Sequence, residues 1–186
     1  MKRIKICVLT VTIAMVQSAL YMEWEGEVQE IENKREEQNR ATEIVRKGVL
    51  EGKDNLIFKG LTEGASINMR VDEGGNRLIH YFLNRDYFLL QDERDAKERK
   101  RIRNKIKKSI STLIVQYNAD LNIQNDDDDT PLHLAVLLCD FDIVELLIGE
   151  GADKSIRDRG GFTPYDLAIS DNVTDQNILD LLNPEK

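Results

Sequence analysis

An internal repeat with a period of 33 residues constrains the fold of this 186-residue chain more than any other feature. Residues 113–120 (LIVQYNAD) recur as 146–153 (LLIGEGAD), and residues 130–135 (TPLHLA) recur as 163–168 (TPYDLA). Both pairs of segments lie 33 residues apart, so two landmarks share one period. A period of this length indicates a solenoid of stacked units, because one such unit cannot bury its apolar side chains alone.

The same pattern occurs once more upstream, at a longer interval. Residues 55–57 (NLI) and 64–68 (GASIN) match residues 142–144 and 151–153 at a distance of 87 residues. That distance equals two periods of 33 residues plus 21 residues. We therefore expect an insertion of about 21 residues between these two sets of segments.

Each unit has the pattern of two helices followed by a loop. Thr130 can cap a helix, and Pro131 then takes the first helical position, where its missing N–H costs nothing. The apolar residues of 143–148 recur at helical spacing and predict a second helix. Gly151 can end that helix because glycine accepts a left-handed conformation. Residues 152–161 are polar and turn-rich, so we expect a hairpin-like finger before the next helix pair.

These segments resemble the ankyrin repeat family, most closely in TPLHLA at 130–135 and GAD at 151–153. The resemblance implies an all-α fold, an ankyrin-type helical solenoid of about four stacked helix-turn-helix units. The longer interval upstream adds an elongated basic helical insertion in the second unit, which is the part least like the family. The expected units are a capping repeat, a repeat with the insertion, a third repeat and a C-terminal repeat, at 41–71, 72–124, 125–157 and 158–186. Asp166 stands where the family motif has His. Cys139 stands at a turn usually held by Gly, so we expect that turn to be remodelled.

The two histidines of the chain, His80 and His133, occupy equivalent positions in their units. The resemblance implies that such a histidine bridges backbone groups of adjacent units. Neither lies at a spacing from a Ser, Cys or carboxylate that suggests a nucleophile and its base. The sequence also has no glycine-rich phosphate loop. We therefore expect a protein that is not an enzyme and needs no cofactor.

The N-terminus differs in composition from the rest. Three basic residues precede an apolar run at 6–16, and residues 16–19 (VQSA) offer small residues at the spacing of a signal-peptidase site. Residues 1–18 are therefore interpreted as an export signal, which would make the protein periplasmic or secreted. The alternatives are an uncleaved membrane anchor, although a span needs roughly 20 apolar residues, and a buried strand. Residues 19–40 predict an acidic, solvated linker or a frayed helix.

The segment 97–108 contains eight basic residues and one Glu. Ile102, Ile106 and Ile110 recur every four residues, so the segment predicts an extension of the second helix of its unit, with the isoleucines inward and the cations in solvent. One hypothesis is a solvated face with intramolecular acidic partners. The other is binding of an acidic protein, an anionic lipid or a nucleic acid. The candidate basic patch comprises Arg99, Lys100, Arg101, Arg103, Lys105, Lys107 and Lys108.

Two further clusters are candidates for partner recognition. The acidic run 126–129 lies in a finger and lacks the alternating ligands, the glycine bend and the distal Glu of a calcium loop. We interpret it as a solvated turn or a contact for a basic partner, rather than as a metal site. Leu137 and Leu138, with Phe141 nearby, are candidate apolar contacts in the groove. The candidate partner-binding residues are Leu137, Leu138, Phe141, Asp126, Asp127, Asp128, Asp129, Arg70 and Asp72.

The net charge of −8 argues against a dedicated nucleic-acid binder. Together with the resemblance and the two clusters, this charge leads us to expect a monomeric, non-enzymatic module that binds a protein partner through the groove and the fingers. The alternative is an anionic-surface binder, on a membrane or a nucleic acid, that uses the basic helix 97–108. Membrane contact through an uncleaved signal is a further expectation, and a steep loss of binding with salt would favour the anionic surface.

Overall fold

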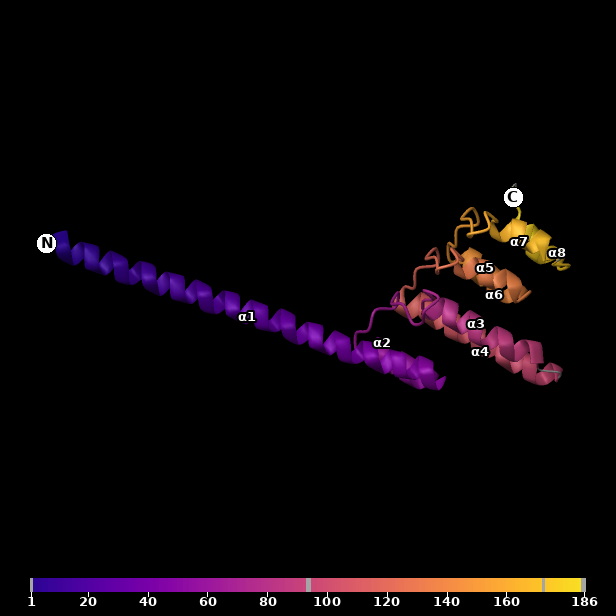
Figure 1. Cartoon of the computed structure of the whole chain (residues 1–186), viewed down its shortest axis with the longest axis horizontal. Coiled ribbons are helices and arrows are strands. Elements are labelled where there is room, and N and C mark those ends of the chain that lie inside the picture. Colours follow the sequence, from indigo (N-terminus) through magenta and orange to yellow (C-terminus); the bar gives the residue numbers. More distant parts are fainter. Residues whose placement is uncertain (1, 93–94, 172, 185–186) are drawn as a thin grey trace. The chain divides into compact units, whose positions relative to one another are not determined.

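The structure is a computed structural model that describes residues 2–92, 95–171 and 173–184, without the side chains of 2–21, 23 and 86–92. These residues form eight helices and no strand, so the predicted all-α fold is confirmed. The helices are α1 (Lys2–Glu51), α2 (Asp54–Thr62), α3 (Leu78–Asp92), α4 (Ala96–Tyr117), α5 (Pro131–Leu137), α6 (Phe141–Gly149), α7 (Pro164–Ser170) and α8 (Gln176–Leu182). They fall into two compact units, Met1–Ala65 and Ser66–Lys186 (Figure 1).

In the first unit, the C-terminal part of α1 packs against α2. Gly52 turns the chain between the two helices at a φ of 65°. Val45 of α1 and Ile57 of α2 are fully buried. Two glycines make room for the contact, because a Cβ at Gly48 would lie 2.7 Å from the Ile57 nitrogen and a Cβ at Gly60 would lie 2.5 Å from Val45 Cγ2.

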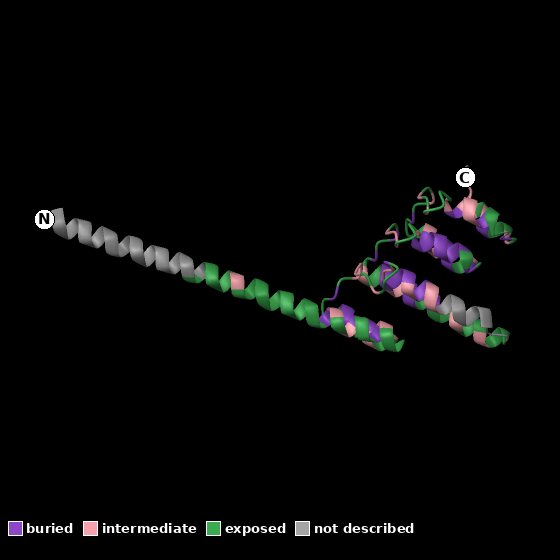
Figure 2. Cartoon of the chain, viewed as in Figure 1, coloured by how far each residue is buried: buried purple, intermediate pink, exposed green. Residues whose placement is uncertain are grey.

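Residues 19–40, predicted as an acidic linker or a frayed helix, belong to α1. Their described side chains are exposed apart from half-buried Val28 (Figure 2). The segment is helical because it is rich in the strong helix formers Glu, Gln, Lys and Arg. The Lys34 ammonium also lies 2.6 Å from the Glu30 carboxylate, one turn away. The predicted export signal, 1–18, lies outside the described side chains and stays a prediction. Among the described residues, no helix combines the length and the apolar character needed to cross a membrane.

The second unit stacks three helix pairs, α3–α4, α5–α6 and α7–α8, in the order of the chain (Figure 1). α5 packs against α3 and α7, and α6 packs against α4 and α8. Each pair therefore covers apolar side chains of its neighbours, as the repeat predicts. The buried core includes Leu78, Phe82, Ile106, Ile110, Leu113, Leu132, Ala135, Ile143, Leu147, Ala168 and Ile178.

The predicted helix starts in the repeats are confirmed. Thr130 and Thr163 cap α5 and α7, and a proline follows each of them at the start of the helix. Each threonine accepts a hydrogen bond from the backbone N–H three residues later, which satisfies one of the free donors at the helix start. Gly151, after α6, has a φ of 98°, and Asn118, 33 residues earlier at the end of α4, has a φ of 53°. Both helices thus end on a left-handed residue.

The expected remodelling of the turn at Cys139 is wrong. Cys139 keeps the left-handed conformation, with a φ of 50°. The chain has room for few residues between α5 and α6, and the Cys139 N–H donates a 3.0 Å hydrogen bond to the carbonyl of Val136. Asp140 then caps α6 through the N–H of Asp142. These two hydrogen bonds hold Cys139 in a conformation that costs a non-glycine residue about 1 kcal/mol.

The extra length of the α3–α4 pair is shared by both helices, whereas we expected it in the second helix alone. α4 has 22 residues and α3 has 15, against 9 residues in α6. An apolar stripe on a lengthened helix needs an apolar partner, so the two helices lengthen together. Ile106 and Ile110 of α4 are fully buried, as predicted, and so is Phe82 of α3.

Candidate functional site: the fingers and the basic helix

A short finger precedes each of the helix pairs in the second unit. The fingers are residues 71–76, 125–129 and 158–162. In each finger, the N–H of the first residue donates to the carbonyl of the last residue, at 2.8, 3.0 and 2.9 Å respectively. Each finger also contains one residue with positive φ next to its last residue, namely Gly75, Asp128 and Gly161. The shared geometry places the three tips in series along the stack.

Backbone hydrogen bonds join each finger to the next. The Asp126 N–H donates to the Gly74 carbonyl at 2.9 Å, and the Arg159 N–H donates to the Asp127 carbonyl at 3.0 Å. The fingers therefore form a continuous edge rather than three independent loops. A surface held this way loses little conformational entropy when it binds a partner.

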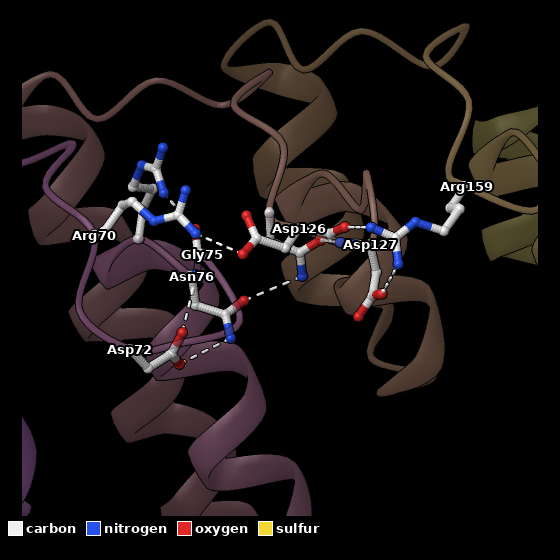
Figure 3. Close-up of polar contacts among 9 residues, drawn as sticks. Arg70, Asp72, Gly75, Asn76, Asp126, Asp127 and Arg159 are labelled. Carbon is white, nitrogen blue, oxygen red and sulfur yellow. Dashed lines mark hydrogen bonds and ion pairs between the residues drawn. The ribbon is translucent and has the colours of Figure 1, made fainter.

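Two ion pairs reinforce the same edge (Figure 3). The Arg70 guanidinium lies 2.5 Å from the Asp126 carboxylate, and the Arg159 guanidinium lies 3.0 Å from the Asp127 carboxylate. Arg159 also donates to the carbonyl of Asp126. The predicted acidic run is therefore not a set of four free carboxylates, because two of them are paired within the chain. Arg70, a predicted partner contact, is engaged in the first of these pairs.

The remaining predicted acids of the fingers differ in accessibility. Asp72 accepts hydrogen bonds from the N–H and the side-chain amide of Asn76, at 3.0 and 2.9 Å. Asn76 in turn accepts a bond from the side-chain amide of Asn125 at 3.1 Å. Asp129 is half-buried, and burial raises its pKa. Asp128 is exposed at the tip of its finger and takes no part in the cross-finger ion pairs.

The predicted apolar pair is corrected to a single exposed leucine. Leu137 is 36% exposed, whereas Leu138 is 6% exposed and belongs to the core. The Leu138 N–H still donates to the Leu134 carbonyl, so Leu138 lies one helical turn after buried Leu134, on the same face of α5. Phe141 is half-buried at the start of α6. A partner therefore has Leu137 available, but not Leu138.

The histidines lie inside the stack. His133 accepts a hydrogen bond from the Thr130 N–H at 3.2 Å, and its Nε2 lies 3.0 Å from the Phe162 carbonyl in the next finger. It thus has the bridging role that the resemblance implies. His80 accepts from the Arg77 N–H at 3.1 Å and is fully buried. Burial and the Arg77 guanidinium lower the pKa of His80 to about 4.

The cations of the basic patch are divided between ion pairs and solvent. The Arg103 guanidinium lies 3.4 Å from the Asp140 carboxylate, and the Lys107 ammonium lies 3.4 Å from the Asp142 carboxylate at the start of α6. Within α4, Arg101 pairs with Glu98 at 3.1 Å. In the described part of the chain, the α4 cations without an ion pair are Lys97, Arg99, Lys100 and Lys108.

The sequence did not reveal two features of these surfaces. One is the ion pair of Arg159 with Asp127. These residues lie 32 positions apart, close to the repeat period, and this spacing was the signal that could have indicated the pair. The other is a cleft of about 440 Å³ between α4 and the start of α6. A second cleft, of about 560 Å³, lies at the last repeat and is lined by residues that include Lys154, Tyr165 and Leu182.

The described residues include no group of three or more His, Cys, Asp or Glu side chains placed to hold a metal ion. Cys139 is an exposed free thiol. Partial desolvation and the Asp171 carboxylate raise the pKa of that thiol, away from the reactive thiolate form.

Residues 102–185 match the family model for ankyrin repeats in three copies. This part of the chain is therefore similar to ankyrin repeats, in agreement with its stacked helix pairs. A putative ankyrin repeat protein of Fowlpox virus (strain NVSL) is 33% identical over 122 residues, which are 63% of this chain and 30% of that protein.

Two human proteins match shorter stretches. NF-kappa-B inhibitor alpha is 50% identical over 50 residues, 27% of this chain and 16% of the inhibitor. The 2-5A-dependent ribonuclease is 43% identical over 56 residues, 30% of this chain and 8% of the ribonuclease. The chain thus spans less than a third of the length of each of these relatives.

Proposed function

We propose that this chain is a non-enzymatic module that binds a protein partner through the edge formed by the three fingers and the adjoining helices α3, α5 and α7. The observation that carries the proposal is the pair of backbone hydrogen bonds between successive fingers. Because these bonds order the edge before any encounter, little of the binding free energy is spent on ordering it.

The exposed side chains on this edge suit a mixed contact. Leu137 supplies apolar surface, and Asp128 supplies an exposed carboxylate that is outside the cross-finger ion pairs. An apolar centre with charged residues around it is typical of protein interfaces. The relative named NF-kappa-B inhibitor alpha, an inhibitor by its name, supports a role in binding another protein.

The test compares variants of the full chain in quantitative affinity capture from its native source. Leu137→Asp introduces a charge at the apolar contact, and Asp128→Asn removes a charge while keeping a residue that tolerates positive φ. Leu138 is unsuitable because it is buried. We expect both variants to lower capture of the same protein at least about fivefold, which is about 1 kcal/mol.

The matched control is Val115→Asp. Val115 is 71% exposed on α4, a helix outside the proposed edge, so this variant should capture the partner normally. Equal capture by wild type and Leu137→Asp, with both proteins folded, would exclude this edge as the binding surface.

We also propose that the protein is exported through residues 1–18 and acts as a monomer. The supporting observation is the sequence of that segment, in which a basic start precedes an apolar run and small residues. Mass spectrometry of the protein from its native source would give the mature N-terminus. An N-terminus at Met1 in the mature protein would contradict cleavage.

A further inference from the structure

We propose that the cleft between α4 and the start of α6 is a second recognition site, which binds an acidic peptide segment of a partner protein. This site is separate from the fingers and does not rest on the function proposed for them. It arises because one helix is longer than its neighbour. α6 begins at Phe141, which lies one repeat period of 33 residues after Lys108. The start of α6 therefore corresponds to Lys108 of α4, and most of the basic segment of α4 lies N-terminal to that position.

The cleft lies at this step and is charged. Its volume is about 440 Å³. It is lined by Ala96, Arg99, Lys100, Arg103, Asn104, Lys107, Asp140 and Asp142. The α4 members of this set lie at 96, at 99 and 100, at 103 and 104, and at 107, so they recur at every turn of the helix and share one face. The lining contains four cations and two carboxylates, a local charge of +2 in a chain whose net charge is −8.

Two of the four cations are already neutralised. Arg103 and Lys107 pair with Asp140 and Asp142 across the cleft, each at 3.4 Å. Arg99 and Lys100 line the same cleft, are exposed, and have no ion pair in the described part of the chain. Their charges are therefore available to a ligand. An arginine in such a position can hold a carboxylate through two parallel hydrogen bonds.

The shape and the mixed charge of the cleft favour a peptide over the other anionic ligands. Asp142 has a side chain that is 63% exposed, so the cleft offers a hydrogen-bond acceptor beside its two available cations, which suits a ligand that carries donors as well as anions rather than the acceptor-only phosphates of a nucleic acid. The same carboxylate can accept hydrogen bonds from the N–H groups of a peptide. A flat bilayer would contact a wider area of the chain than the cleft, and the net charge of the chain is negative.

The experiment measures fluorescence anisotropy of a fluorescein-labelled decaglutamate peptide, with labelled decaglutamine as the uncharged reference, on the full chain. We expect binding of decaglutamate that weakens as salt is raised, and no binding of decaglutamine. The double variant Arg99→Glu/Lys100→Glu should weaken binding of decaglutamate at least about tenfold, because it reverses the two available charges of the cleft.

The control is Lys97→Glu/Lys108→Glu, which makes the same change in net charge on the same helix, at exposed cations outside the cleft. It should weaken binding less than about threefold, through long-range electrostatics alone. Circular dichroism checks that both variants remain helical.

Three results would overturn the proposal. The first is an equal loss of decaglutamate affinity in the two double variants, which would indicate a diffuse electrostatic effect. The second is the absence of decaglutamate binding at low salt. The third is tighter binding of the chain to phosphatidylserine vesicles or to duplex DNA than to decaglutamate. Binding of decaglutamate that is lost only in the cleft variant supports the site, whatever happens to partner capture by the finger variants.

Discussion

Cys139 and Asp128 hold positive φ angles at positions where a glycine would carry no steric cost. The repeat itself shows the alternative, because the residue 33 positions after Asp128 is Gly161, which also has positive φ. Asp tolerates this conformation better than most side chains do, and Cys does not share that tolerance. The residue at position 139 is therefore strained by the turn that joins α5 to α6.

Replacing Cys139 by glycine should raise the free energy of unfolding by about 0.5–1 kcal/mol, because the left-handed strain disappears at the expense of some chain entropy. Urea unfolding followed by circular dichroism measures the change. Cys139→Ser, which keeps a side chain at the same φ, is the control and should show no gain. A glycine variant no more stable than the serine variant would show that the turn is not strained.

The buried His80 should make the protein acid-sensitive. Its pKa is lowered from 6.5 to about 4, chiefly by burial. As the pH falls below 6.5, the unfolded chain takes up a proton that the folded chain does not bind until about pH 4. His80 therefore contributes its full stabilisation above pH 6.5. As the pH falls from 6.5 to 4, the free energy of unfolding decreases by roughly 3 kcal/mol because this contribution is lost.

The measurement is urea unfolding between pH 7 and pH 5, with His80→Gln as the comparison. The variant should lose less stability over this range than the wild type does. A titration of the His80 ring by NMR in the wild type gives an independent check, and a midpoint near 6.5 would contradict the lowered pKa.

The fingers and the helix pairs are held by different forces. The cross-finger ion pairs are largely exposed, so each contributes little, typically below about 1 kcal/mol. The backbone bonds between fingers recur along the stack, and the bridge from His133 to the Phe162 carbonyl adds to the second of these junctions. In the first unit, α1 and α2 approach closely because Gly60 presents no side chain to α1.

Gly60→Ala should lower the free energy of unfolding of the first unit by about 1–3 kcal/mol, because the new Cβ would lie 2.5 Å from Val45 Cγ2 and 2.7 Å from the Ala41 carbonyl. Gly26→Ala is the matched control, since a Cβ there meets nothing within 4 Å. It should instead stabilise α1 by about 0.5–1 kcal/mol through helix propensity. Thermal unfolding of both variants measures these changes, and equal effects would contradict the close contact.

The middle helix pair of the second unit has neighbours on both sides. α5 packs against α3 and α7, and α6 packs against α4 and α8. Stability in a repeat protein is approximately the sum of the stabilities of the repeats and of the interfaces between neighbours. The pair α5–α6 takes part in two such interfaces, and the pair α7–α8 takes part in one among the described residues.

Amide hydrogen exchange should therefore be slowest in α5–α6 and faster in α7–α8, by about tenfold or more in native conditions. Mass spectrometry of peptic peptides from the full chain gives this comparison directly. Peptides from α7–α8 that exchange as slowly as those from α5–α6 would show that the second unit opens as one cooperative block.

The repeat period, the capped helix starts and the buried isoleucines of α4 were predictable, because they depend on local spacing and on residue type. The burial of Leu138, the length of α3 and the left-handed Cys139 were not, since each depends on what an adjacent element requires. The acidic run shows the same limit, because its partners Arg70 and Arg159 lie 56 and 32 residues away from it in the chain.

The amino-acid sequence by itself thus determined a stack of helix pairs with fingers between them. Helix N-caps, glycines that end helices and the spacing of apolar residues are local signals that involve only a few neighbouring residues. Tertiary structure alone decided which charged side chains remain available, because an ion pair forms only where packing brings two distant charges within reach. That is why Arg99 and Lys100 face an open cleft, whereas Asp126 and Asp127 are paired.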